Sequence, residues 1–275
     1  MENKKIKAVV TGGAGFIGSH LADALNKKGF EVVVVDIKNG ADILDTKKLK
    51  KIFIGAKFVF HCAALPRVPY SIEHPQETNE NNVDGTLSVL VAARAAGVKR
   101  VIYSASSSAY GDQETMPLVE TMPANPKSPY GLQKYIGELY CKLFSEIYGL
   151  ETVSLRYFNV YGPGASANGA YALVIARFVK QRLNGEPMTI TGDGKQTRDF
   201  THVRDVVRAN LLAAESKKVG RGEMMNIGAG KNASVNKVAK LIGGPVKYVP
   251  ARLEPRRSLA DSSLAKKLLG WEPKI

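Results

Sequence analysis

The segment TGGAGFIGSH, residues 11–20, restricts this chain to a small set of folds. It follows a short β-branched run at residues 7–10 and opens a stretch with helical spacing, so it predicts a strand, a tight turn and a helix. Gly12, Gly15 and Gly18 permit the turn, the close approach of a pyrophosphate to backbone N–H groups, and tight helix–strand packing. The segment therefore predicts a dinucleotide-binding βαβ unit.

The rest of the N-terminal half repeats this alternation of strand and helix. Short apolar runs predict further strands at residues 31–36, 58–64, 100–106 and 151–157, and helical spacing predicts helices at 15–28, 44–52, 76–96 and 127–148. Such alternation indicates an α/β fold, a Rossmann-type doubly wound parallel sheet. We expect an NAD-binding domain at 1–162, with about 198–227 folding back onto it, and a smaller substrate-binding region at 163–275.

An acidic residue follows the second predicted strand. Asp36 lies 18 residues after Gly18, close to the spacing of a carboxylate that binds the adenosine ribose. A carboxylate there accepts hydrogen bonds from the 2′-hydroxyl of NAD and repels the 2′-phosphate of NADP. The competing interpretation is a plain turn residue, and Lys38 nearby weakens the case against NADP.

The stretch SPYGLQKYIGELY, residues 128–140, begins like a helix with Ser128 as its cap and Pro129 in its first position. Tyr130 and Lys134 then share one helical face. The ammonium and the helix dipole both favour the ionised phenol, which could then act as a base. The alternative is a half-buried Tyr130 with a solvated Lys134, because Tyr-x-x-x-Lys by itself is a weak motif.

Composition excludes several classes of function. Apolar residues make up 44% of the 275-residue chain, no apolar run reaches the length of a membrane span, and we expect a cytoplasmic protein. The net charge of +14 comes from dispersed lysines, which predict a solvated surface and no nucleic-acid partner. Two cysteines and four histidines follow no ligand spacing, so we expect no metal.

Taken in order, TGGAGFIG, Asp36, YSASSSAYGD and Tyr130-x-x-x-Lys134 resemble an extended short-chain dehydrogenase/reductase. The chain is most similar to the nucleotide-sugar epimerases, and among them to UDP-glucose 4-epimerases. HCAALPRVPYS, NNVDGT, LRYFNVYGP, TRDFTHVRDV, NIGAG and LADSSLAKKLLGW carry the resemblance over almost the whole length. It implies NAD as cofactor, a UDP-sugar substrate, a homodimer formed through 84–96 and 135–147, and a further C-terminal helix.

The resemblance also implies a role for individual residues. The catalytic set is Ser106, Tyr130 and Lys134, with Ser104 beside the cofactor. Phe16 and Ile17 line the pyrophosphate together with the three glycines. The other residues that it places at the cofactor are Asp42 and Ile43 at the adenine, Ala63 and Ala64 at the third strand, Asn81 at the ribose, and Tyr157 and Phe158 flanking the nicotinamide. The residues that it places at the substrate are Asn159, Arg198, Arg252 and Ser258, with Ser106.

The reaction implied is interconversion of UDP-glucose and UDP-galactose through a 4-keto sugar. A 4,6-dehydratase carries acidic residues after its catalytic Ser or Thr, whereas here Ser107 and Ser108 offer no carboxyl group. A decarboxylase, a dehydrogenase and a non-catalytic NAD-binding regulator remain as alternatives. The resemblance places Ser258 in the wall of the sugar pocket, and its small side chain predicts that the pocket also accepts UDP-N-acetyl sugars.

Overall fold

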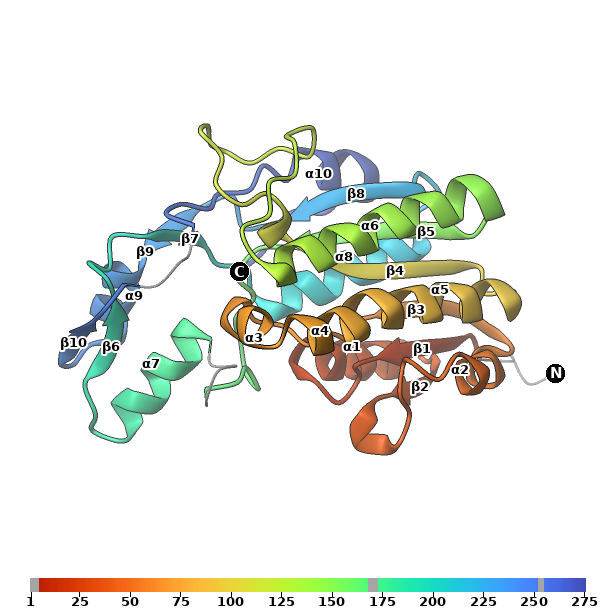
Figure 1. The fold of residues 1–275 in the computed structure, drawn as a ribbon, viewed down its shortest axis with the longest axis horizontal. Coiled ribbons are helices and arrows are strands. Elements are labelled where there is room, and N and C mark those ends of the chain that lie inside the picture. The colour runs from red at the N-terminus through yellow and green to blue at the C-terminus, as the bar shows by residue number, and fades with distance from the viewer. Residues whose placement is uncertain (1–4, 168–172, 252–254) are drawn as a thin grey trace.

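The computed structural model describes residues 5–167, 173–251 and 255–275 (Figure 1). Its centre is a six-stranded sheet in which every neighbouring pair is parallel. The strand order is β2-β1-β3-β4-β5-β8. The bounds are β1 Lys7–Thr11, β2 Glu31–Val35, β3 Ala56–His61, β4 Arg100–Ser106, β5 Glu151–Tyr157 and β8 Arg221–Ile227. This arrangement confirms the predicted fold class.

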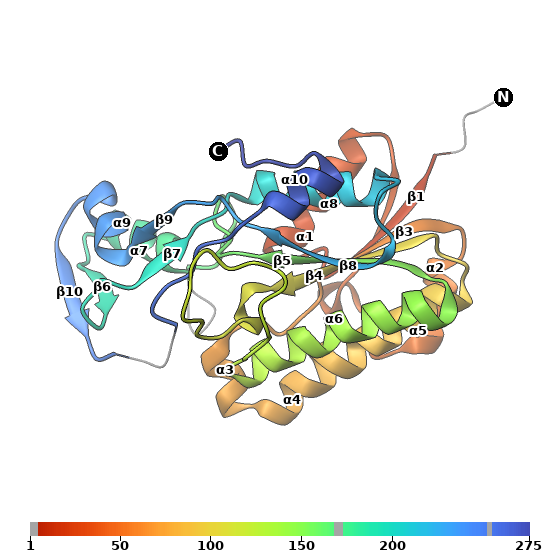
Figure 2. The same cartoon turned by 90° about the horizontal axis from the view of Figure 1, so that it is seen from above.

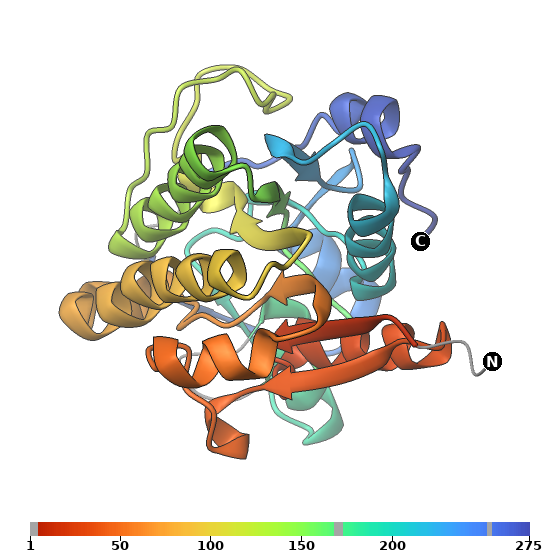
Figure 3. The same ribbon diagram turned by 90° about the vertical axis from the view of Figure 1, so that its right-hand side faces the viewer.

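Helices cover both faces of the sheet, and Figures 2 and 3 show the two layers. One face packs against α1 (Phe16–Lys27), α8 (Val203–Glu215) and α10 (Ser263–Leu269). The other face packs against α2 (Thr46–Phe53), α5 (Gly85–Ala95) and α6 (Pro129–Tyr148). Because both faces are buried, the strands read as nearly continuous apolar runs, which is why the sequence revealed them.

The direction of winding reverses next to β1. From β1 the chain moves outward to β2, and it then crosses to the other side of β1 to form β3. In open α/β sheets, ligands bind at the carboxyl ends of the strands beside such a reversal. The expected crevice therefore lies where Gly12, Asp36 and Cys62 follow their strands.

A smaller lobe extends from this end of the sheet, at the left in Figure 1. It contains α7 (Val174–Leu183), α9 (Val235–Ile242), the parallel pair β6 (Met188–Thr191) and β10 (Val246–Val249), and the antiparallel pair β7 (Thr197–Asp199) and β9 (Asn232–Ser234). Phe178, Met188 and Ile190 form its core. Between these elements α8 and β8 return to the main sheet. Trp271 also packs against the main sheet, and its Nε1 donates to Asp205 O at 2.9 Å. Trp271 thus belongs to the main domain, although residues 163–275 were expected to be mainly substrate-binding.

Two predicted elements differ from the observed ones by more than the one or two residues seen at the ends of the others. The strand expected at 58–64 ends at His61, because the following backbone turns to pass Gly12 and Cys62 N donates to Thr11 O. The helix expected at 76–96 consists of α4 (Pro75–Asn79), a π-helical turn (Glu80–Asp84) and α5. Short α3 (Val68–Glu73) precedes it. No helix within the described ranges is long and apolar enough to cross a membrane.

Candidate active site

The glycine turn after β1 is shaped for a phosphate group. Gly12 has φ +67°, and a Cβ there would lie 2.6 Å from Ala63 N. A Cβ at Gly18 would lie 2.2 Å from Gly12 O, so the helix can approach the turn only without a side chain. Gly15 caps α1 without a side-chain bond, which leaves the first N–H groups, including those of Phe16 and Ile17, without intrahelical partners. Such N–H groups at a helix start attract phosphate.

Asp36 follows β2 and lies beside this turn. Its Oδ2 accepts from Ala14 N at 3.0 Å and its Oδ1 from Lys38 N at 3.0 Å. Each carboxylate oxygen has a second lone pair, so a ribose hydroxyl can still be bound. Asp42 is exposed and accepts from Leu44 N at 2.9 Å. The Ile43 side chain is buried among apolar residues, so only its backbone can meet an adenine.

The next contacts predicted for the cofactor follow β3. Ala63 N donates to Thr11 Oγ1 at 3.3 Å, which fixes the backbone of Ala63 and Ala64 beside the glycine turn. Asn81 lies on the π-helical turn, and its buried Oδ1 has no hydrogen-bond partner among the described residues. A buried acceptor without a partner is costly, and a donor from a bound ligand satisfies it. The glycine cradle and this orphaned oxygen together fit a dinucleotide.

The three predicted catalytic residues come from β4 and α6. Ser106 ends β4, where its Oγ accepts from Ser108 N at 3.2 Å and donates to Ser108 Oγ at 3.1 Å. Tyr130 is the second residue of α6, and its N–H donates to Ser71 Oγ at 3.1 Å. Lys134 Nζ donates to Ser104 O at 2.9 Å. The structure therefore gathers all three side chains at the carboxyl end of β4.

The electrostatics of Tyr130 differ from the sequence-based expectation. Burial raises the pKa of Tyr130 above its ordinary value, while a hydrogen bond with Ser106 and the charge of Arg67 act in the opposite direction. Burial lowers the pKa of Lys134 to about 8. The expected lowering of the phenol's pKa by Lys134 is therefore wrong, because Lys134 turns to Ser104 O and Arg67 supplies the nearby charge.

Tyr157 and Phe158 have their side chains in the core. Tyr157 Oη lies 3.2 Å from Ser104 Oγ and accepts from Asn210 Nδ2 at 2.8 Å. Phe158 is fully buried and packs beside Tyr110. The fully buried Phe158 ring leaves only the Phe158 backbone to meet a nicotinamide. For Tyr157, which contacts Ser104, the position beside the nicotinamide stays a prediction.

A cavity of about 140 Å³ opens between the sheet and the smaller lobe. Asn159 and Arg198, which were predicted to bind the substrate, line it, and so do Arg67 and Arg177. Three guanidinium groups around one cavity favour an anionic ligand such as a diphosphate. Arg67 lies within the motif HCAALPRVPYS but had no role assigned to it, and Arg177 lies in α7, outside every predicted element and motif.

The remaining substrate predictions have different outcomes. Ser258 is 8% exposed, and its Oγ accepts from Asn159 Nδ2 at 3.2 Å and from Asp199 N at 3.3 Å. Ser258 therefore does not face solvent, and it lies directly behind the cavity wall at Asn159. Arg252 lies outside the described residues.

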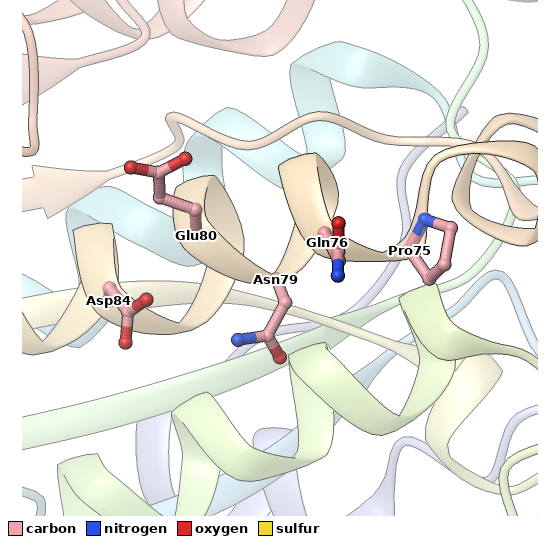
Figure 4. Close-up of a pocket in the computed structure, with 5 residues that line it drawn as sticks. All are labelled: Pro75, Gln76, Asn79, Glu80 and Asp84. Atoms are coloured by element: carbon pink, nitrogen blue, oxygen red, sulfur yellow. The ribbon is translucent and has the colours of Figure 1, made fainter.

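A second hollow lies on the outer side of α4 and the π-helical turn. It has a volume of about 470 Å³ and is lined by Pro75, Gln76, Asn79, Glu80 and Asp84 (Figure 4). These side chains come from a single helical stretch, and none follows a strand of the central sheet. Across the described ranges, no group of three His, Cys, Asp or Glu side chains is arranged to hold a metal ion.

Comparisons with known proteins show the family to which the chain belongs. The model of the NAD dependent epimerase/dehydratase family matches residues 8–228. A putative UDP-glucose 4-epimerase from Methanocaldococcus jannaschii is 39% identical over 97% of this chain and 93% of its own length. A UDP-N-acetyl-alpha-D-glucosaminuronate decarboxylase from Bacillus cytotoxicus is 37% identical over 86% of this chain and 79% of its own.

Two solved structures have nearly the same fold. UDP-glucose 4-epimerase from Thermotoga maritima, solved with UDP-glucose, has a TM-score of 0.92 and 40% identity over 98% of this chain and 94% of its own. UDP-N-acetylglucosamine 4-epimerase from Methanobrevibacter ruminantium, solved with UDP-N-acetylmuramic acid, has the same TM-score of 0.92. It is 39% identical over 98% of this chain and 94% of its own. The chain therefore belongs to the NAD dependent epimerase/dehydratase family, the extended short-chain dehydrogenases/reductases that act on nucleotide sugars.

Proposed function

We propose that this enzyme interconverts UDP-glucose and UDP-galactose by epimerisation at C4. The observation that carries the proposal is the convergence of Ser106, Tyr130 and Lys134 at the carboxyl end of β4, next to a cavity with three arginines. Such a set can move a proton at a sugar hydroxyl, and the arginines can hold the diphosphate.

The chemistry follows from these side chains. Bound NAD supplies the acceptor and donor of the C4 hydride. Tyr130 Oη takes the proton of the 4-hydroxyl, with Arg67 and Ser106 opposing the effect of burial on its pKa. Ser106 Oγ donates a hydrogen bond to the same sugar oxygen as it becomes a carbonyl. With NAD bound, Lys134 would hold the cofactor ribose, and Asn81 Oδ1, which has no hydrogen-bond partner among the described residues, would accept from a ribose hydroxyl.

The sugar must then turn about its bond to the diphosphate and present its other face. Arg198 holds the diphosphate during this motion, and Asn159 lines the same cavity beside it. The two amide hydrogens of Asn159 are donated to Asp199 O and Ser258 Oγ, so this side chain shapes the wall and does not itself bind the diphosphate. Tyr130 finally returns the proton to the 4-oxygen. Ser258 carries no bulky side chain behind Asn159, so we extend the proposal to UDP-N-acetyl sugars.

Elimination of water and a purely regulatory role fit less well. Ser107 and Ser108 occupy the positions after Ser106 where a dehydratase needs carboxyl groups, and Ser108 is already bonded to Ser106. A non-catalytic regulator has no use for a Ser-Tyr-Lys set gathered at the end of a strand. Ser106, Tyr130 and Lys134 are all present here.

The test is product analysis with a panel of nucleotide sugars. We expect UDP-glucose and UDP-galactose to interconvert without net release of NADH, because the hydride returns to the same sugar. UDP-N-acetylglucosamine should be epimerised within about tenfold in kcat/KM. Steady NADH release would instead establish a dehydrogenase, and loss of CO₂ from UDP-glucuronate a decarboxylase. No reaction and no reduced nicotinamide after adding any sugar would support the regulator.

A further inference from the structure

Three residues proposed for the substrate come from distant parts of the chain. Asn159 follows β5, Arg198 lies in β7, and Ser258 lies in the last quarter of the sequence. All three segments meet at Asp199, which ends β7 and is 0% exposed. Its side chain and its backbone each make bonds to these segments.

The Asp199 carboxylate ties β7 to two loops. Its Oδ1 accepts from Ala229 N at 2.7 Å, and its Oδ2 accepts from Gly230 N and Ala260 N, both at 3.0 Å. Gly228 permits this approach, because a Cβ there would lie 2.9 Å from Asp199 Oδ2. The carboxylate thereby fixes the turn after β8 and the segment that follows Ser258.

The Asp199 backbone completes the arrangement. Its N–H donates to Ser258 Oγ at 3.3 Å, and its carbonyl accepts from Asn159 Nδ2 at 3.0 Å. The same Asn159 amide donates to Ser258 Oγ at 3.2 Å. Asn159 has φ +29°, a conformation that non-glycine residues seldom adopt and that surrounding bonds must maintain.

We propose that Asp199 is the positioning residue of the substrate site, the group that holds Asn159, Arg198 and Ser258 in one fixed geometry around the diphosphate and sugar. This inference rests on the proposed function, because it assigns a purpose to the same nucleotide-sugar cavity. Asp199 itself is fully buried and does not line the cavity, so it acts through the residues that it holds.

The carboxylate suits this task because it only accepts hydrogen bonds. Three backbone N–H groups converge on its two oxygens, so an amide at this position would point an N–H₂ donor at other donors. At least one bond would be lost and the loops would move apart. Asp199→Asn therefore disturbs the three segments with almost no change in side-chain volume.

A purely structural role would produce a different result, and Asp205 provides the matched control. Asp205 is also a buried carboxylate, and it accepts from the backbone N–H groups of Lys274 and Ile275. It lies six positions further along the chain and touches none of the three substrate segments through its side chain. Asp205→Asn should therefore reproduce the loss of stability without the loss of substrate binding.

The experiment measures UDP binding to the NAD-loaded enzyme by calorimetry, together with NAD content and the urea midpoint of unfolding. We expect Asp199→Asn to weaken UDP binding about tenfold or more with unchanged NAD content, since one charged hydrogen bond is worth about this factor. Asp205→Asn should leave UDP affinity within about twofold. Equal UDP affinity in wild type and Asp199→Asn, or equal weakening in both variants, overturns the inference.

Ser258→Ala provides a second variant should Asp199→Asn not fold. It removes the hydroxyl that joins Asn159 to Asp199 and leaves the carboxylate in place. We expect about threefold weaker UDP binding, since one neutral hydrogen bond is lost; unchanged binding contradicts the inference. If the wild-type protein holds NAD but does not bind UDP, both the proposed function and this inference are wrong. If the wild type binds UDP and neither variant changes its affinity, only the inference about Asp199 is wrong.

Discussion

Tyr130 and Ser106 divide the proton chemistry, and their packing lets the two contributions be separated. Tyr130→Phe keeps the ring and its burial while it removes the proton acceptor. We expect kcat to fall at least about 10³-fold, and Ser106→Ala to lower it about 10²-fold, because Ser106 only assists the transfer. NAD content should stay near wild type. Tyr135→Phe on the same helix is the control, and more than a tenth of wild-type activity in Tyr130→Phe would refute the assignment.

His61 makes the enzyme sensitive to acid. Thr86 Oγ1 donates to Asn82 O at 2.6 Å, so it can only accept from His61 Nε2. Thr11 Oγ1 then donates to Nδ1 at 2.7 Å, and the imidazole is neutral. Burial lowers the pKa of His61 to about 3 from an ordinary value of 6.5. Between these values the unfolded chain binds more protons, so stability declines as the pH falls below 6.5.

This sets the size of the expected effect. From pH 7.5 to pH 5.0 the free energy of unfolding should fall by about 2 kcal/mol through His61. This is the free energy that corresponds to the roughly 1.5 pH units between the ordinary pKa of 6.5 and pH 5.0. His61→Gln should lose this part of the pH dependence, whatever its effect at pH 7.5. Urea unfolding at both pH values measures it, with exposed His74→Gln as the control. An equal decline in wild type and His61→Gln would contradict the assignment.

At the scale of elements, we predict that the turn around Asp36 decides which dinucleotide binds. Asp36 accepts from Ala14 N and Lys38 N, so it holds the glycine turn next to the place proposed for the cofactor ribose. Asp36→Ala should weaken NADH binding about tenfold and reduce the preference over NADPH, because the repulsion of a 2′-phosphate is removed. Fluorescence titration with both nucleotides measures this. Equal affinity of the unaltered protein for both would overturn the role given to Asp36.

The elements that could be predicted from the sequence are those with local signals. Buried parallel strands are continuous apolar runs, and the glycine turn has its own spacing. The π-helical turn at Glu80–Asp84 has no such signal, because one extra residue in a turn leaves the apolar periodicity almost unchanged. Yet this turn carries Asn81, and Asn82 in it bonds both Leu65 and Gln133. Its contacts become visible only when distant segments pack.

The same limit applies to the candidate site. Ser106, Tyr130 and Lys134 could be placed from motif spacing, whereas Arg177 reaches the cavity only because α7 packs across it. The burial that raises the pKa of Tyr130 likewise depends on tertiary packing and could not be read from helical spacing. Local spacing predicts which residues act, and long-range packing decides their protonation and their neighbours.

At the scale of the whole molecule, one outer face presents apolar side chains to solvent. α5 and α6 lie side by side on this face (Figures 1 and 2). Leu139, Leu143 and Ile147 of α6 are 43%, 45% and 64% exposed, and their spacing of four places them on one side of the helix. Apolar stripes of this kind typically mark an interface. They support the prediction of a homodimer formed through 84–96 and 135–147.

The oligomeric state tests this prediction directly. Sedimentation equilibrium should give twice the chain mass of 29.7 kDa for the wild type. The double variant Leu139→Glu, Leu143→Glu should sediment as a monomer, because two carboxylates would be buried without partners at the interface. Leu183→Glu on α7 is the control, since Leu183 is 82% exposed on the smaller lobe and should not affect assembly. A monomeric wild type, or a double variant that remains dimeric, would show that the exposed stripe of α6 serves another purpose. Tyr130 and Lys134 lie on the same helix as the exposed stripe, so loss of the dimer should also affect kcat. Because α6 still packs on the sheet in a monomer, we expect kcat to fall by no more than about tenfold.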